Sequence, residues 1–413
     1  MKTDFDIVIV GAGMVGTCAA TLLARSGLCP AARIALIDAK PPSAPAMDAD
    51  IDLRVSAISR ATERILTACG VWDAVRRARI HPYQRMSVWE AGSAPDGSGA
   101  VHFDAADVGE PNLGYIVENR WLQWQLFDAA ARSGIAIFRQ SVTTLELSDA
   151  QAVVGLSEGR KLSAALVIAA DGADSPLRGL AGIETKGWGY AQEALVTHIE
   201  TELPHRDTAR QRFLETGPIA LLPLADGRSS IVWSTTPEQA QAMREVDADD
   251  FARAVERATD HVLGAVKAAA PRASFPLRLL HAKHYTRPRF ALIGDAAHAV
   301  HPLAGLGVNL GFLDAAALVE CLVDARAAGA ELGDLKTLRR YERWRKSENI
   351  AAMGMLDGIN RLFANSNPTL SRLRRFGLGA VDSLTPVKNF FIRRALGTAG
   401  DLPRAAKPRP VPV

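Results

Sequence analysis

The sequence predicts an α/β fold in which a parallel-sheet domain is interleaved with a β-rich domain and followed by C-terminal helices. Three observations support this prediction. Several uncharged apolar runs end in a glycine or an acidic residue, which is typical of parallel strands that are buried on both faces. Residues 194–236 alternate like paired strands, and helical periodicity dominates after residue 312. With 413 residues, the chain is long enough for more than one hydrophobic core.

The first apolar run, residues 7–10, leads into a glycine-rich turn. The spacing Gly-x-Gly-x-x-Gly allows a tight turn, a close approach of the backbone to a pyrophosphate and close packing of the next helix. The free N–H groups at the start of that helix would face the phosphates. We therefore predict a Rossmann-like dinucleotide site made by Gly11, Ala12, Gly13, Met14, Val15 and Gly16.

The second apolar run, residues 34–37, ends at Asp38, roughly twenty residues after the last glycine. A carboxylate at this position can accept hydrogen bonds from both hydroxyls of a ribose, and it disfavours a 2′-phosphate. We expect Asp38 and Ala39 to lie at the adenosine ribose.

Two later strands also end in turns that combine a glycine with a carboxylate, Asp171-Gly172 and Gly294-Asp295. The carboxyl ends of parallel strands meet at one edge of the sheet, so one extended cofactor could contact all of these turns. A flavin dinucleotide fits better than a nicotinamide dinucleotide, because its ribitol hydroxyls need an acceptor such as Asp295. The alternative is that Asp295 only caps the following helix.

The segment 296–311 precedes an amphipathic helix over residues 312–328. Backbone N–H groups and a helix dipole would meet there and stabilise the negative charge of reduced flavin. His298 and His301 are interpreted as structural residues in preference to catalytic bases. A single complete glycine motif predicts that NADPH or NADH visits only transiently. Cofactor contacts are expected from Pro302, Gly305, Leu306, Gly307, Val308 and Asn309.

The predicted domains are discontinuous. Residues 1–185 and 275–345 form the nucleotide-binding domain, residues 186–274 a β-rich substrate domain, and residues 346–413 a helical region. Asp226-Gly227 is a typical hairpin turn inside the β-rich domain. Tyr190, Gln192 and Trp233 are candidates to line the substrate side, and ordinary packing within the sheet is the alternative.

The composition excludes several classes of protein. A net charge of +3 gives no basis for nucleic-acid binding. The four cysteines are scattered without metal-ligand or redox spacing, so we predict no metal site and a reducing cytoplasm. We expect neither a signal peptide nor a membrane-spanning segment.

Four motifs together resemble those of the single-component FAD-dependent aromatic hydroxylases of the para-hydroxybenzoate hydroxylase type. They are residues 11–16 (GAGMVG), 52–59 (DLRVSAIS), 170–178 (ADGADSPLR) and 294–311 (GDAAHAVHPLAGLGVNLG). More narrowly, the chain resembles the hydroxylases of ubiquinone biosynthesis over nearly its whole length. It departs from them at Leu306, where that subgroup usually has glutamine.

The resemblance implies a bound FAD, held partly by Asn119 and Val142, with Arg54 beside the pyrophosphate on the docking path of NAD(P)H. Asp171 and Gly172 match a motif with a double role toward flavin and nicotinamide. The implied reaction uses NAD(P)H and O₂, through a flavin C4a-hydroperoxide, to hydroxylate a polyprenylated phenol on the way to ubiquinone. It assigns no catalytic acid or base. The alternatives are an FAD-dependent prenyl or quinone reductase and a non-catalytic flavin-binding subunit of a ubiquinone-biosynthesis complex.

A prenylated substrate must come from a membrane or a carrier. Apolar and basic residues are interleaved over residues 370–394, a composition suited to an anionic lipid surface. The alternative is a helix pair that packs on the core or on a second copy of the chain. We expect a cytoplasmic protein, peripheral at the inner membrane in the first case, with other ubiquinone-biosynthesis proteins as further partners.

Overall fold

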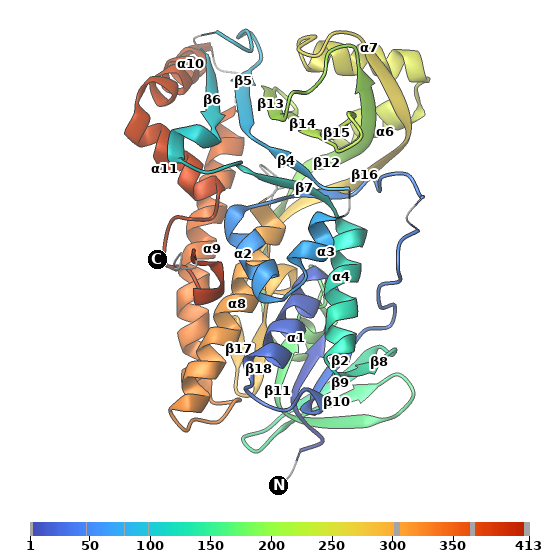
Figure 1. Ribbon diagram of the computed structural model, residues 1–413, viewed down its shortest axis with the longest axis vertical. Helices are drawn as coiled ribbons and strands as arrows, with labels where there is room; N and C mark the ends of the chain where they lie inside the picture. Colours follow the sequence, from blue (N-terminus) through green and yellow to red (C-terminus); the bar gives the residue numbers. More distant parts are fainter. Residues whose placement is uncertain are drawn as a thin grey trace.

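A computed structural model describes residues 3–46, 48–77, 79–97, 99–300, 306–363 and 368–408. Figure 1 shows two sheet domains stacked along the long axis, with helix α9 (Leu335–Phe363) running beside both. Among the described residues, no helix combines the length and the apolar character needed to cross a bilayer.

The first sheet has the strand order β17-β18-β11-β1-β2-β8, and its five strands from β18 to β8 are parallel. The apolar runs of β1, β2 and β11 are completely buried near their carboxyl ends, because helices cover both faces. The strands are β1 (Phe5–Val10), β2 (Ile34–Ile37), β8 (Ala136–Phe138), β9 (Val142–Leu147), β10 (Ala152–Leu156), β11 (Lys161–Ala169), β17 (Thr286–Arg287) and β18 (Phe290–Leu292).

The helices of this domain follow loops at the ends of strands, as the sequence predicts. Helix α1 follows the glycine turn and ends at Gly27, whose φ of 70° is the left-handed conformation of a helix C-cap. The helices and short 3-10 turns are α1 (Met14–Ser26), η1 (Ala31–Arg33), α2 (Arg60–Ala68), α3 (Trp72–Arg76), α4 (Asn119–Arg132), α5 (Pro176–Leu180), η3 (Gly294–Ala296) and α8 (Leu306–Ala327).

The second sheet has the strand order β19-β16-β12-β15-β14-β13-β5-β6. Helices α6 and α7 cover one of its faces. The predicted hairpin at Asp226-Gly227 is confirmed, with Gly227 at a φ of 90° between β14 and β15. The elements are β5 (Arg85–Glu90), β6 (Ala100–Asp104), η2 (Ala105–Val108), β12 (Thr185–Thr201), β13 (Thr208–Leu214), β14 (Gly217–Pro223), β15 (Ser229–Thr235), α6 (Pro237–Glu245), α7 (Ala248–Ala258), β16 (Val266–Ala282) and β19 (His298–Ala299).

The second sheet extends beyond the range 186–274. Strands β5 and β6, which lie within the predicted nucleotide-binding range, join its edge because β5 pairs in parallel with β13 from Arg85 to Glu90. A small third sheet, made of β3 (Val55–Ile58), β4 (His81–Tyr83) and β7 (Gly114–Glu118), connects the two domains.

The C-terminal helices lie against both domains. Helix α9 continues without a break across residue 345, where the sequence predicted the start of a separate region, because buried Arg345 and Asn349 tie it to the first domain. Helices α10 (Pro368–Ser383) and α11 (Thr385–Ala395) then pack beside β6 and η2, and the turn η5 (Arg404–Ala406) lies against α2 and α8.

Candidate active site

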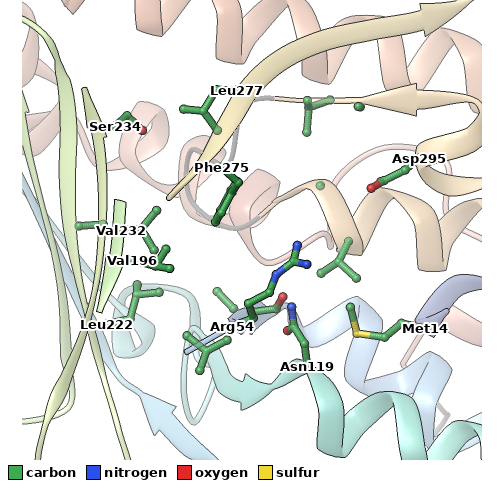
Figure 2. A pocket seen from close by; sticks show the side chains of 18 of the residues that line it. Met14, Arg54, Asn119, Val196, Leu222, Val232, Ser234, Phe275, Leu277 and Asp295 are labelled. Carbon is green, nitrogen blue, oxygen red and sulfur yellow. The ribbon is translucent and has the colours of Figure 1, made fainter. Parts of the chain in front are cut away.

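A cavity of about 560 Å³ lies between the two sheets, within the size range of cofactor and substrate pockets. Its two ends differ in chemistry. Figure 2 shows Met14, Asn119 and Asp295 at one end and apolar side chains of the second sheet at the other. Arg54 and Phe275 lie between the ends, with the guanidinium carbon of Arg54 at 5.5 Å from the ring centroid of Phe275.

The glycines of the first turn have distinct structural roles. Gly11 has a φ of 106°, and a Cβ there would collide with the carbonyl of Ala170. A Cβ on Gly16 would collide with the carbonyl of Gly11, so Gly16 permits the close packing of α1. In contrast, a Cβ on Gly13 would meet no atom within 4 Å, because Gly13 borders the open cavity. The turn therefore leaves space for a pyrophosphate at Gly13, at the N-terminus of α1.

Asp38 lies beside this turn at the end of β2. Its carboxylate accepts hydrogen bonds from the backbone N–H of Ala12 at 2.7 Å and from that of Lys40 at 2.7 Å. These bonds fix the carboxylate at the sheet edge, next to exposed Ala39 and outside the lining of the main cavity.

Arg54 and Asn119 are adjacent although 65 positions separate them in the sequence. The β3–β7 pairing brings them together, and the backbone N–H of Asn119 donates to the carbonyl of Arg54 at 3.0 Å. Among the described residues, the buried Oδ1 of Asn119 has no hydrogen-bond donor. Such an orphaned acceptor at a cavity wall fits a bound hydroxyl or N–H group. Gln123, one turn along α4, donates to the carbonyl of Ala12 at 3.1 Å.

The turn after β11 presents backbone to the cavity. Asp171 accepts hydrogen bonds from the hydroxyl of Ser175 at 2.5 Å and from the N–H of Leu177 at 3.0 Å, so its side chain holds the start of α5. Burial raises the pKa of Asp171. Gly172, with a φ of 88° and open space at its Cβ position, lines the cavity. Asp171 therefore shapes the turn, and Gly172 offers the contact surface.

Asp295 presents its carboxylate to the cavity from the turn η3. Gly294 has a φ of 60°, and a Cβ there would press against Val15 at 3.1 Å, so this turn fits closely on α1. Desolvation by the surrounding protein raises the pKa of Asp295, and the nearby His298 and Arg54 oppose that shift. Helix α8 begins only at Leu306, so Asp295 does not cap it, and the capping alternative is wrong.

A buried ionic cluster supports this turn from behind. Asp314 on α8 accepts hydrogen bonds from the N–H of Gly294 at 3.1 Å, from Nε2 of His298 at 2.5 Å and from Nε of Arg345 at 2.9 Å. Asn349 donates to the same carboxylate at 3.1 Å. Burial alone would raise the pKa of Asp314, but His298 and Arg345 lower it below its usual value. The interpretation of His298 as a structural residue agrees with these contacts, whereas the role of Arg345 was not predicted from the sequence.

The first turn of α8 borders the cavity through Gly307 and Val308. The N–H groups in the first turn of an α-helix have no partner within the helix, so this end is suited to negative charge. Asn309 points elsewhere, since its buried side chain accepts from the N–H of Ser59 at 2.9 Å and donates to the carbonyl of Ala57 at 2.8 Å. Pro302, Gly305, His301 and the side chain of Leu306 lie outside the described residues.

The predicted substrate residues do not line this cavity. Trp233 is 3% exposed and packs under α6 and α7, on the opposite face of β15 from Val232 and Ser234, so its assignment to the substrate side is wrong. The hydroxyl of Tyr190 donates to Asp357 at 3.2 Å, and Gln192 donates to the carbonyl of Thr216 at 2.6 Å.

The apolar end is instead lined by alternate residues of the second sheet. Because side chains alternate between the two faces of a strand, these residues could have been identified from the sequence if the face covered by helices had been known. The sequence also missed the contribution of β16. Val142 starts β9 and, like the three residues above, is absent from the cavity wall. The lining residues at this end include Val196, Ala220, Leu222, Val232, Ser234, Phe275 and Leu277.

Within the described part of the chain, one set of side chains has spacing suited to a metal ion, and it consists of His81, His205 and Asp207. His81 already bonds to Asp207 at 2.8 Å, and His205 bonds to the carbonyl of Leu224 at 3.2 Å. These groups satisfy one another, and they lie outside the lining of the main cavity.

Comparison with known sequences identifies relatives that span the whole fold. A family model described as an FAD binding domain matches residues 4–350. The chain is 37% identical to the 3-demethoxyubiquinol 3-hydroxylase of Escherichia coli, over 95% of this chain and 98% of that protein. It is 36% identical to the ubiquinone hydroxylase UbiL of Rhodospirillum rubrum, over 95% and 90%. It is 34% identical to the human ubiquinone biosynthesis monooxygenase COQ6, over 94% and 91%.

Solved structures share the fold at low sequence identity. The p-nitrophenol 4-monooxygenase PnpA from Pseudomonas putida has a TM-score of 0.75 at 19% identity, with 96% of this chain and 99% of that chain covered. HpxO from Klebsiella pneumoniae, in complex with FAD and uric acid, has a TM-score of 0.72 at 18% identity, with 95% and 96% covered. The overall fold of this chain is therefore shared with these solved structures.

Proposed function

Because the chain belongs to the family of FAD-dependent hydroxylases of ubiquinone biosynthesis, we propose that it adds a hydroxyl group to the aromatic ring of a polyprenylated phenol. It is an FAD-dependent monooxygenase, and its relatives are named as hydroxylases and monooxygenases, which does not favour a reductase or a non-catalytic subunit. The observation that carries the proposal is one cavity with a polar end at the glycine turn and an apolar end at the second sheet.

The polar end has groups that fit FAD. The open position at Gly13 and the N-terminus of α1 suit the pyrophosphate, the orphaned Oδ1 of Asn119 suits a hydroxyl donor, and Asp295 suits the ribitol chain. FAD, when bound, supplies the redox chemistry that takes electrons from NAD(P)H and activates dioxygen. The roles of the individual residues follow from their position and chemistry.

The protein contributes position, charge and exclusion of water. The first turn of α8 and the guanidinium of Arg54 place positive potential at the cavity, where reduced flavin would carry negative charge. At the other end, Val196, Leu222 and Val232 give a wall without ionisable groups, which suits an aromatic ring and keeps competing water out. With this arrangement of the cavity, no acidic or basic side chain of the protein has to act on the substrate ring.

We also propose that the enzyme collects its substrate while bound peripherally to a membrane. Leu384, Val387 and Phe390, at the start of and along α11, expose 53%, 38% and 57% of their surface. Several basic residues of this region are already engaged, since Lys388 pairs with Asp107 at 3.0 Å and Arg394 with Glu348 at 3.4 Å. The apolar side chains therefore support the proposal more strongly than the charge does.

A strain that lacks this protein tests the proposed reaction. The expected result is accumulation of a prenylated phenol that is one oxygen atom short of the next ubiquinone precursor, identified by mass spectrometry, and its loss when the intact gene is restored. Unchanged ubiquinone with no accumulated precursor would refute the proposal. Restoration with a Gly13→Ala variant is the matched control, because that variant is expected to fold but to bind FAD poorly.

A further inference from the structure

A second cavity, of about 440 Å³, lies between the edge of the second sheet and the three C-terminal helices. Its walls come from β5, β6 and β13 on one side and from α9, α10 and α11 on the other. The described side chains that form it are overwhelmingly apolar and include Val88, Val101, Phe213, Leu356, Phe363 and Leu378. The rings of Phe213 and Phe363 stack at 4.0 Å between centroids and hold the sheet and α9 together at this place. Two arginines also line it, but Arg374 pairs with Glu90 at 2.8 Å and Arg394 with Glu348 at 3.4 Å, so the cavity suits a hydrocarbon chain better than a charged ligand.

This cavity borders the active-site cavity. Tyr83, Met86 and Gln211 line both of them. Met86 on β5 and Gln211 on β13 lie on the same face of the paired strands, because the register places Met86 beside Ala209 and Gln211 beside Val88. A ligand in the apolar end of the first cavity can therefore extend past these three side chains into the second.

The far end of the second cavity reaches the exposed apolar surface of α9 and α11. Leu362 lines the cavity and is 43% exposed. Phe391 also lines it, and its ring lies 5.7 Å from that of Phe390, which points outward. Apolar side chains thus extend from the surface at α11, through the wall of the second cavity, to the side chains that it shares with the active-site cavity.

We propose that this second cavity holds the prenyl chain of the substrate while the phenol ring lies in the first cavity. The inference rests on the proposed function and adds a binding site to it. A prenyl chain is the occupant that the geometry favours, because the cavity has mostly apolar walls, shares three wall residues with the site for the ring and lies beside an apolar surface patch. Burial of a hydrocarbon tail then contributes binding energy remote from the reacting ring.

Gly377 on α10 allows this cavity to be filled without disturbing the fold. It lines the cavity, it lies within a helix, and a Cβ there would meet no atom within 4 Å. The matched control is Gly358 on α9, which also has open space at its Cβ position but is exposed and lines neither cavity. We compare Gly377→Phe with Gly358→Phe in the full-length, FAD-loaded protein.

The first readout is binding of a fluorescent diprenyl probe that carries no phenol ring. We expect saturable binding to the wild type and to Gly358→Phe, and at least about tenfold weaker binding to Gly377→Phe. A prenyl alcohol should displace the probe, whereas a straight-chain alcohol of equal carbon number should do so poorly. Equal probe binding by all three proteins, or equal displacement by the straight chain, would overturn the assignment.

The second readout distinguishes a failure of the proposed tail site from a failure of the proposed function. NAD(P)H oxidation is followed with a methoxyphenol that has no tail and with the same phenol carrying a diprenyl tail. Gly377→Phe should raise the KM for the tailed phenol about tenfold or more and leave the KM for the tailless phenol unchanged. If neither phenol stimulates the wild type, the proposed function fails, and the probe still decides whether the cavity binds a prenyl chain. Equal effects of Gly377→Phe on both phenols would contradict the tail site.

Discussion

Asp295, which we propose to hold the ribitol chain of FAD, has a carboxylate whose burial is unfavourable when the cavity is empty. Its carboxylate lies in the wall of the cavity, where desolvation raises its pKa, while His298 and Arg54 only oppose this effect. A raised pKa in the folded state means that folding favours the protonated carboxyl, so stability falls as the pH rises through that pKa. At neutral pH, Asp295 therefore destabilises the cofactor-free protein.

The first prediction concerns Asp295→Asn. The cofactor-free variant should be more stable than the cofactor-free wild type at pH 7, and the difference should vanish below the ordinary aspartate pKa of about 3.9. Its affinity for FAD should fall about ten- to a hundredfold, because a charge-assisted hydrogen bond is lost. Urea unfolding across pH and titration with FAD measure both effects. A variant that is less stable at pH 7, or one that binds FAD normally, would contradict this account of Asp295.

Asp314 has the opposite relation to pH. Because His298 and Arg345 lower its pKa, its contribution to stability is present above the ordinary aspartate pKa and is lost as the pH falls through the lowered value. We predict that Asp314→Asn destabilises the protein by about 3–5 kcal/mol at pH 7, since it leaves buried Arg345 without its counter-ion. The difference in the free energy of unfolding between the variant and the wild type should become smaller below about pH 4. Urea unfolding across pH measures this difference.

The control for this prediction is on the same helix. Asp324 pairs with Arg340 at 3.0 Å near the surface, so Asp324→Asn should cost less than about 1 kcal/mol. Equal losses in the two variants would show that the buried cluster behind Gly294 contributes no more than a surface ion pair.

At the scale of elements, the strand-to-helix turns were predictable because local residues determine them. An apolar run that ends in glycines or an acid specifies both a buried strand and the close approach at its end, as Gly11, Asp38 and Gly294 show. The face of a strand was not predictable in the same way. From the sequence, Trp233 is a candidate for the substrate side because it lies in the β-rich domain, with packing in the sheet as the alternative. In the structure, α6 and α7 cover its face of β15, so the alternative holds. That choice depends on helices distant in the sequence.

The glycine turn gives the third prediction. Gly13→Ala should leave the unfolding midpoint of the cofactor-free protein unchanged and weaken FAD binding roughly tenfold or more, because the new methyl group enters only the empty cavity. Gly11→Ala should instead destabilise the fold, since its φ is positive and its Cβ would collide with Ala170. Gly179→Ala, at an exposed position with open space, is the neutral control. Thermal unfolding and FAD titration distinguish the three, and normal FAD binding by Gly13→Ala would refute the role of this turn.

At the scale of the molecule, the sequence predicted two interleaved domains and missed how they exchange segments. The edge strands β5 and β6 join the second sheet through pairing with β13, more than a hundred positions away, and no local pattern in residues 85–104 specifies that partner. For the same reason, the second cavity could not be predicted from local sequence patterns, because its walls come from β5, β13 and α9, which are distant from one another in the sequence. Long-range pairing therefore creates both the substrate end of the site and the path that leads from it.

The fourth prediction addresses membrane binding. Leu384→Ser combined with Phe390→Ser should weaken binding to anionic vesicles by at least about tenfold for each side chain, because buried apolar area is lost. Leu203→Ser, at a leucine that is 49% exposed outside this patch, should have no effect. Vesicle co-sedimentation measures it. Removal of α10 and α11 is a poorer test, since Ile392 and Leu396 belong to a buried cluster with Ala105 and Leu113. Unchanged binding by the double variant would refute the role of the patch.

The central claim is that FAD in the cavity between the sheets directs an oxygen atom from dioxygen onto the substrate ring. It is tested most directly by reacting the purified, FAD-loaded protein with NAD(P)H and a diprenyl methoxyphenol under ¹⁸O₂, followed by mass spectrometry of the product. The account predicts one ¹⁸O atom in each hydroxylated product and none when the label is in the water instead. Oxidation of NAD(P)H without label in the phenol, or a hydroxyl group derived from water, would contradict it.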